Sequence, residues 1–265
     1  MDRREFVETC STGLACLTAS MALPALAADA KPHPYARVLL TDERGSALRA
    51  SRLKAQTNYV FHYPFEATPV FLLNLGKPTQ AQSLSTEGKS SYLWPGGAGP
   101  ERSIVAFSAI CAHQLVYPTQ QVSFISFRKT KAGKGLADNL IHCCADHSQY
   151  DPAQGARVLG GPARQPLCAV LLEHDPKNDS LTAWATLGGE LFEEFFRKYE
   201  FKLSLDSVQE VMKRRIHESA HILTRHNEIC LCNCHLDITD KGAEEMPITQ
   251  HRRHGLTMTC FTRSF

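Results

Sequence analysis

Two short segments of this chain each carry one thiol and one imidazole. Cys111 and His113 form a Cys-x-His pattern, and Cys144 and His147 form a Cys-x-x-His pattern further along the chain. Two thiolates and two imidazoles are a donor set that binds a zinc ion. The same set binds a [2Fe–2S] cluster in which two Cys hold one iron and two His hold the other. Residue types and spacing alone leave both possibilities open.

The residues that follow the second pattern favour the iron–sulfur cluster. A Tyr-Asp-Pro run begins at Tyr150, and a loop rich in glycine and proline spans residues 160–167. This order of motifs resembles the cluster-binding region of the Rieske iron–sulfur family. The resemblance covers residues 100–187 closely and residues 35–100 loosely. It implies one [2Fe–2S] cluster per chain, with Cys111, His113, Cys144 and His147 as its ligands.

The resemblance also implies roles for residues around the cluster. Hydroxyl groups just after the second His donate hydrogen bonds to sulfur in this family, which makes Ser148 and Tyr150 the candidates here. Gly161 and Pro162 belong to the loop that would form a rigid third wall over the cluster. Two imidazoles in place of thiolates raise the reduction potential, and exposed imidazoles couple proton release to oxidation.

The sequence departs from the family pattern in the loops themselves. High-potential members carry an extra Cys in each loop, joined as a disulfide, and the equivalent positions here lie near Val116 and Asp146. The segment after His147 lacks the customary glycine and is one residue short. Cys143 stands beside Cys144, and we assign the ligand to Cys144 because only it gives the Cys-x-x-His spacing.

The N-terminus has the features of an export signal. Arg3 and Arg4 precede an apolar stretch over residues 12–28 that ends in small residues. This pattern is typical of a twin-arginine signal, a route that exports folded proteins with cofactors already inserted. Residues 1–30 are therefore predicted to be a signal or a membrane anchor. We expect the protein in the periplasm or on the periplasmic face of the inner membrane.

Composition excludes some classes of function. The chain has 265 residues, of which 43% are hydrophobic, enough for a packed core. Lys and Arg number 29 against 27 Asp and Glu, which is too balanced to favour nucleic acid as a partner. The ten cysteines are clustered rather than spread as in a disulfide scaffold.

Short segments rich in Val, Ile, Phe and Tyr alternate with Gly, Pro, Asn and Asp over residues 31–187, which predicts an antiparallel β domain. The resemblance implies a Rieske-like β-sandwich with a cluster-binding subdomain at residues 104–167. The fold class is therefore expected to be mainly β with a helical C-terminal extension. The predicted strands are residues 37–40, 59–65, 70–75, 104–107, 122–127, 157–159, 169–173 and 181–186.

Residues 188–265 are predicted to be a helical and irregular extension. Apolar residues at helical spacing predict helices over residues 190–196 and 204–225. The sequence His-Glu-Ser-Ala-His at residues 217–221 matches the zinc-binding H-E-x-x-H motif, which five residues can match by chance. A tight cluster of soft donors follows, which could bind zinc or copper, pair as disulfides after export, or have no specific role: Cys230, Cys232, Cys234 and His235.

These observations predict an electron-transfer protein with no substrate chemistry of its own. It would serve as a subunit or partner of a respiratory or periplasmic oxidoreductase. Its expected partners are a redox protein such as a c-type cytochrome, or a catalytic or quinol-oxidising subunit, with membrane association through the N-terminal segment. The alternative is a zinc-binding structural or hydrolytic protein that uses the Cys/His motifs or the segment at residues 217–221.

Overall fold

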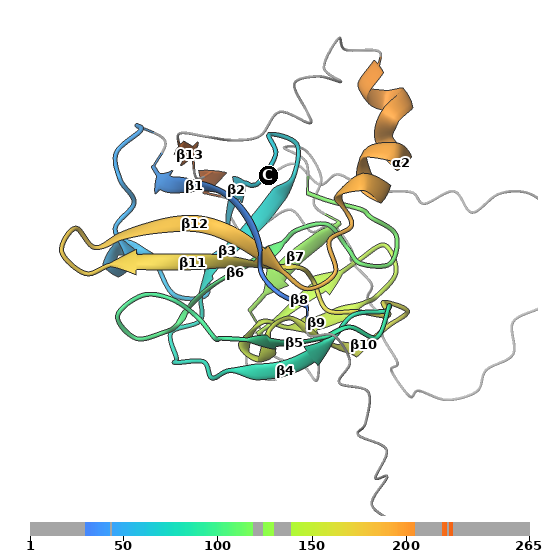
Figure 1. Ribbon diagram of the computed structural model, residues 1–265, viewed down its shortest axis with the longest axis horizontal. Coiled ribbons are helices and arrows are strands. Elements are labelled where there is room, and N and C mark those ends of the chain that lie inside the picture. Colours follow the sequence, from blue (N-terminus) through green and yellow to red (C-terminus); the bar gives the residue numbers. More distant parts are fainter. Residues whose placement is uncertain are drawn as a thin grey trace, which may run out of the picture.

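The computed structural model describes residues 30–42, 44–118, 124–129, 139–204, 219–221 and 223–224. These residues form three β-sheets and one α-helix, α2 (Phe192–Ser204), as Figure 1 shows. The expected mainly β, antiparallel fold class is confirmed. Within the described ranges, no helix combines the length and apolarity that crossing a membrane requires.

The largest sheet has eight strands in the order β13-β1-β12-β11-β6-β3-β2-β14. All neighbours pair antiparallel except β1 and β13, which pair parallel. In chain order its strands are β1 (His33–Thr41), β2 (Tyr59–His62), β3 (Pro69–Asn74), β6 (Ile104–Ser108), β11 (Ala169–Asp175), β12 (Ser180–Leu187), β13 (Ser219–His221) and β14 (Leu223–Thr224).

Two smaller sheets complete the fold. One has the order β10-β9-β8-β7, and the other is the β4-β5 hairpin. Their strands are β4 (Gln82–Ser85), β5 (Ser91–Trp94), β7 (Ile125–Arg128), β8 (Leu140–Cys143), β9 (Gln149–Asp151) and β10 (Arg157–Gly160). Short 3-10 turns lie at Ala50–Arg52 and Pro152–Gln154.

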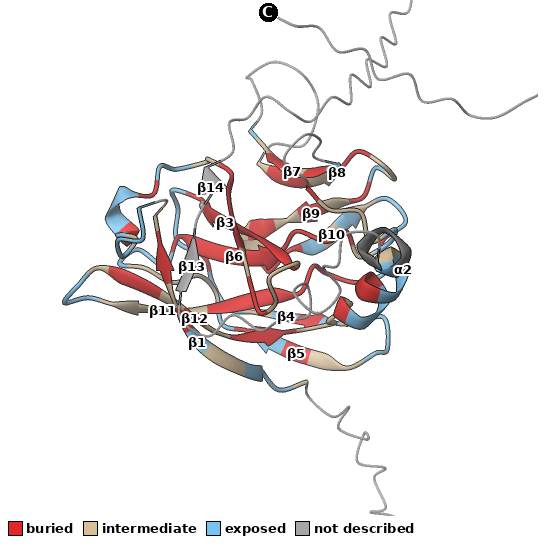
Figure 2. Ribbon diagram, turned by 90° about the horizontal axis from the view of Figure 1, so that it is seen from above, coloured by how far each residue is buried: buried red, intermediate tan, exposed pale blue. Residues whose placement is uncertain are grey.

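Alternation along β3 divides the core between the two faces of the large sheet. Phe71 and Leu73 belong to a buried cluster that also contains residues of the four-stranded sheet, such as Ile141 and Tyr150. Val70 and Leu72 belong to a second cluster on the other face. Successive side chains of a strand point to opposite faces, so one hydrophobic strand supplies both clusters. Figure 2 shows the buried strands of both sheets.

The predicted strands are confirmed at β1, β2, β3, β6, β7, β10, β11 and β12. The sequence patterns missed β4, β5, β8 and β9, which are short and carry polar residues. The expected helix at residues 190–196 is confirmed by α2, which begins at Phe192.

The helix expected over residues 204–225 is wrong at its C-terminal end. Residues 219–221 form β13 on β1, and residues 223–224 form β14 on β2, at the two edges of the large sheet. The unpaired edge strands of the sheet offer hydrogen-bonding partners to the backbone of these residues. The local sequence pattern gives no sign of such a distant partner. Because His221 lies in a strand, the helical form of the H-E-x-x-H motif is absent at this residue.

Several predicted features lie outside the described residues. These are residues 1–29 of the export signal, His217 and Glu218 of the H-E-x-x-H match, and the cysteine cluster at residues 230–235.

Candidate metal centre

Two loops meet at one end of the sheets and bring the candidate donors together. The first follows β6 and begins at Cys111, whose N–H donates to the Val116 carbonyl at 2.9 Å. The second joins β8 to β9. Here the Cys143 N–H donates to the Ser148 carbonyl at 2.8 Å, which closes a tight turn.

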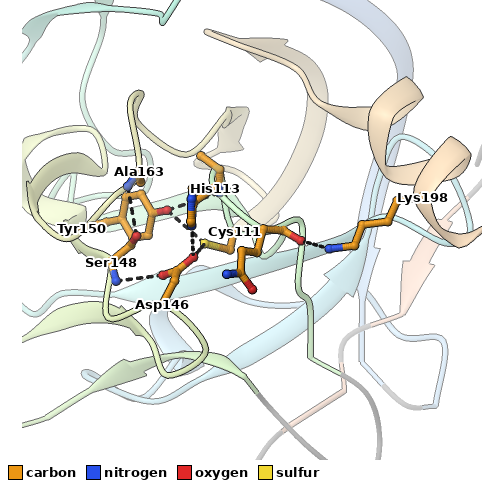
Figure 3. Close-up of polar contacts among 9 residues, drawn as sticks. Cys111, His113, Asp146, Ser148, Tyr150, Ala163 and Lys198 are labelled. Atoms are coloured by element: carbon orange, nitrogen blue, oxygen red, sulfur yellow. Dashed lines mark hydrogen bonds and ion pairs between the residues drawn. The ribbon is translucent and has the colours of Figure 1, made fainter. Parts of the chain in front are cut away.

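Four donors converge where these loops meet, as Figure 3 shows in part. Ligand atoms of Cys111, Cys143 and Asp146 all lie within 4.8 Å of one another. The Asp146 Oδ2 atom lies 3.2 Å from the Cys111 sulfur and 3.0 Å from Nδ1 of His113. Both cysteines are fully buried, whereas the His113 side chain is 37% exposed. The two thiols therefore lie inside and the imidazole faces outward.

The structure brings Cys111 and His113 into this group but not Cys144 and His147. Cys144 follows Cys143 at the end of β8, so its side chain leaves on the opposite side. Its sulfur lies 2.6 Å from Nη2 of Arg128 and forms a disulfide. The His147 side chain is exposed, and its ring contacts His142 with centroids 6.0 Å apart.

Cys143 and Asp146 are the members of this group that sequence reasoning missed. Asp146 had been matched to the position of a loop disulfide, yet its carboxylate lies among the donors. The available signal was the pair of adjacent cysteines together with the missing glycine after His147. Counting from Cys143 rather than Cys144 would have placed Asp146 at the fourth donor position.

The Asp146 carboxyl and the two thiols shift one another's pKa in different directions. Burial raises the pKa of Asp146, but hydrogen bonds from the Ser148 N–H and from both thiols outweigh it and lower that pKa to about 2. A hydrogen bond from the Cys143 thiol lowers the pKa of Cys111 to about 7, against the opposing effect of burial. The pKa of Cys143 is raised by its hydrogen bond to Cys111 and by burial. Ionising all three groups would place like charges in contact, so a bound cation would replace the protons.

Two hydroxyl groups predicted to support the site lie beside it. The Tyr150 oxygen accepts from the Ala112 N–H at 3.2 Å and lies 3.3 Å from the Cys111 sulfur. Burial raises the pKa of Tyr150, so its proton stays available to the sulfur. The Ser148 oxygen accepts from the Ala163 N–H at 3.2 Å, and its side chain also bonds to Asp146.

The loop that carries Gly161 and Pro162 closes onto the second donor loop. Gly161 has a φ of +84°, and a Cβ there would lie 2.5 Å from the Ser148 Cα and 2.8 Å from the His147 carbonyl oxygen. Only glycine permits both this conformation and this approach. Pro162 is exposed, and Ala163 behind it is buried against the site.

Helix α2 packs against the first donor loop. Lys198 donates to the Gln114 carbonyl, and the Tyr199 hydroxyl donates to the Leu115 carbonyl at 3.2 Å. The rings of Phe195 and Tyr117 meet edge to face with centroids 5.1 Å apart. The helix therefore positions the backbone that carries Cys111 and His113.

Comparison with solved structures finds chains whose fold is similar to this one, among them a Rieske domain. The soluble domain of the Rieske protein II (soxF) from Sulfolobus acidocaldarius aligns with a TM-score of 0.41 and 24% identity, over 59% of this chain and 82% of that chain. No family model matches the chain.

Proposed function

We propose that this protein binds one [2Fe–2S] cluster between its two donor loops and carries single electrons. The observation that carries the proposal is the donor set itself. Two fully buried thiols, Cys111 and Cys143, lie close to the buried Asp146 carboxylate, and the partly exposed His113 imidazole contacts that carboxylate. Such a set suits a cluster with one iron held by sulfur and the other by harder donors.

The cluster, when bound, supplies reversible one-electron exchange. The protein's own groups position and tune it. With the cluster bound, the Tyr150 hydroxyl would donate to the Cys111 thiolate and stabilise the more negative reduced state. The loop at Gly161 packs closely against the backbone of the second donor loop. His113, partly exposed at the surface, is the donor through which a redox partner would approach.

The wider role is proposed from the sequence. The chain would act as the electron-carrying subunit or partner of a respiratory or periplasmic oxidoreductase. It would pass electrons to an acceptor such as a c-type cytochrome. Substituting both Arg3 and Arg4 by Lys should then trap the protein in the cytoplasm, as cell fractionation would show. Normal export of that variant would contradict the periplasmic location.

The alternative is a zinc ion at the same donors. One Asp146 oxygen contacts both Cys111 and His113, so thiol, carboxylate and imidazole donors of the kinds that bind zinc lie close together. A single zinc would give a structural protein and no electron transfer. The two candidates differ in metal content and colour.

Anaerobic purification of the full chain tests the proposal. Iron and acid-labile sulfide should be present in equal amounts, and reduction should give an EPR signal whose average g lies below that of an all-Cys cluster. The Cys111→Ser variant should lose both iron and sulfide. Cys168→Ser is the matched control, since Cys168 is also buried and free but lies outside the donor group. A colourless protein with stoichiometric zinc would overturn the proposal.

A further inference from the structure

We infer that Cys143 and Asp146, and not Cys144 and His147, are the second pair of ligands. The proposed cluster would then be held by two thiolates, one imidazole and one carboxylate. This inference rests on the proposed function and assigns the donors of the same site. Three independent observations carry it.

The first observation is the direction of the two adjacent cysteines. Cys143 ends β8 and is fully buried, with its ligand atom within 4.8 Å of those of Cys111 and Asp146. Cys144 leaves on the other side of the strand, where its sulfur lies against Arg128 and forms a disulfide. Bringing Cys144 into the site would require turning the end of β8 over.

The second observation is how the Asp146 carboxylate is oriented. Its Oδ1 atom accepts the Ser148 N–H at 2.9 Å, which fixes the side chain within the turn. This leaves Oδ2 facing Cys111 and His113. The side chain is only 2% exposed. A metal ion bound through Oδ2 would take the place of the Cys111 and His113 contacts of this oxygen, while Oδ1 keeps its hydrogen bond.

The third observation is the backbone at His147. Its φ of +61° is a left-handed conformation that glycine adopts most readily. The sequence appeared to lack the glycine that follows the second ligand and to be one residue short. With Asp146 as the ligand, His147 occupies the position of that glycine. The segment after the second ligand is then no longer one residue short. Two residues separate Cys143 from Asp146, as in the Cys-x-x-His pattern.

The carboxylate changes the charge of the site. An ionised Asp146 contributes one negative charge where a neutral imidazole would contribute none. Negative charge on the ligands opposes reduction. The reduction potential should therefore lie below that of the same site with two imidazoles.

Substitutions at two pairs of neighbouring residues test the assignment in the full chain. The readouts are iron and sulfide content, the EPR spectrum and the midpoint potential. Asp146→His should keep the cluster, raise the midpoint potential and change the EPR g values. Asp146→Asn should lose iron, because a neutral amide is a poor ligand. His147→Ala should leave iron, spectrum and potential unchanged. Cys143→Ser should lose iron, and Cys144→Ser should retain it. Circular dichroism checks that each variant folds.

The opposite pattern would overturn the inference. Loss of iron in Cys144→Ser and His147→Ala, with retention in Cys143→Ser and Asp146→Asn, would assign the ligands to Cys144 and His147.

If the wild-type chain holds no iron–sulfur cluster, the proposed function fails, but Co²⁺ added to the metal-free protein still tests the donors. Its thiolate charge-transfer band should weaken in Cys143→Ser and stay unchanged in Cys144→Ser. The reverse result would refute the inference without any cluster.

Discussion

The two donor loops meet at one site but are held in different ways. The first loop, residues 111–117, is supported from outside by helix α2, which binds its carbonyl groups and packs aromatic rings against it. The second loop, residues 143–149, is held by its own turn, by the disulfide of Cys144 and by the backbone approach of Gly161. With no disulfide between the loops at Val116, each loop has a separate support that a single substitution can remove.

The supports also differ in physical kind. Around the first loop, Phe195 is fully buried in a small aromatic cluster with Phe192, Phe196 and Ile110, so most of its stabilisation is hydrophobic. Around the second loop, polar groups bond to one another and the closest contact is between backbones. The first loop should therefore be destabilised by substitutions that remove side-chain volume. The second loop should be destabilised by substitutions that add side-chain volume.

The largest expected effect is on the support of the first loop. Phe195→Ala should lower the free energy of unfolding by about 3–5 kcal/mol, because it leaves a cavity in the aromatic cluster. Urea unfolding of the metal-free protein measures the change. Arg197→Ala, on the exposed side of α2, is the matched control and should change stability by less than about 0.5 kcal/mol. Equal stability of both variants would mean that α2 does not support the loop.

The next effect is on the second loop. Gly161→Ala should cost about 2–4 kcal/mol, because alanine strains the left-handed backbone and its Cβ overlaps Ser148. Thermal unfolding and iron retention are the readouts, and both should fall. Gly160→Ala is the control, since the nearest atom to its Cβ is 4.0 Å away, on Gln149. If the two alanine variants behave alike, the close approach at Gly161 does not hold the loop.

A smaller effect is expected at Tyr150, the residue that links the two loops. Tyr150→Phe leaves the part-buried Ala112 N–H without its acceptor, which should cost about 1 kcal/mol. In the cluster-loaded protein it should also lower the midpoint potential, because the reduced state loses the hydrogen bond to the Cys111 sulfur. Potentiometry separates the two effects. An unchanged potential would show that the hydroxyl does not reach the sulfur in the loaded protein.

The fold was more predictable from the sequence than the site was. The apolar run that begins β11 and the apolar alternation of β12 are long enough to be seen in the sequence. The structure places Cys111 and His113, two of the predicted ligands, beside Asp146. The choice between Cys143 and Cys144 depends on which face of β8 points inward. That strand is four residues long and includes a polar His142, so its pattern does not reveal its register. The Cys-x-x-His spacing selects His147, whereas the inference above assigns the ligand to the neighbouring Asp146.

The smallest expected effect tests whether the two loops are independent. Tyr199→Phe removes the hydroxyl that donates to the Leu115 carbonyl, which should cost about 0.5–1.5 kcal/mol. Combined with Gly161→Ala in metal-free protein, the two changes should add within about 0.5 kcal/mol, since they act on separate supports. In metal-loaded protein the same pair should depart from additivity, because bound metal joins both loops and its binding free energy becomes part of the folding free energy. Non-additivity already present without metal would mean that the protein itself couples the loops, and that α2 and Gly161 act as one support.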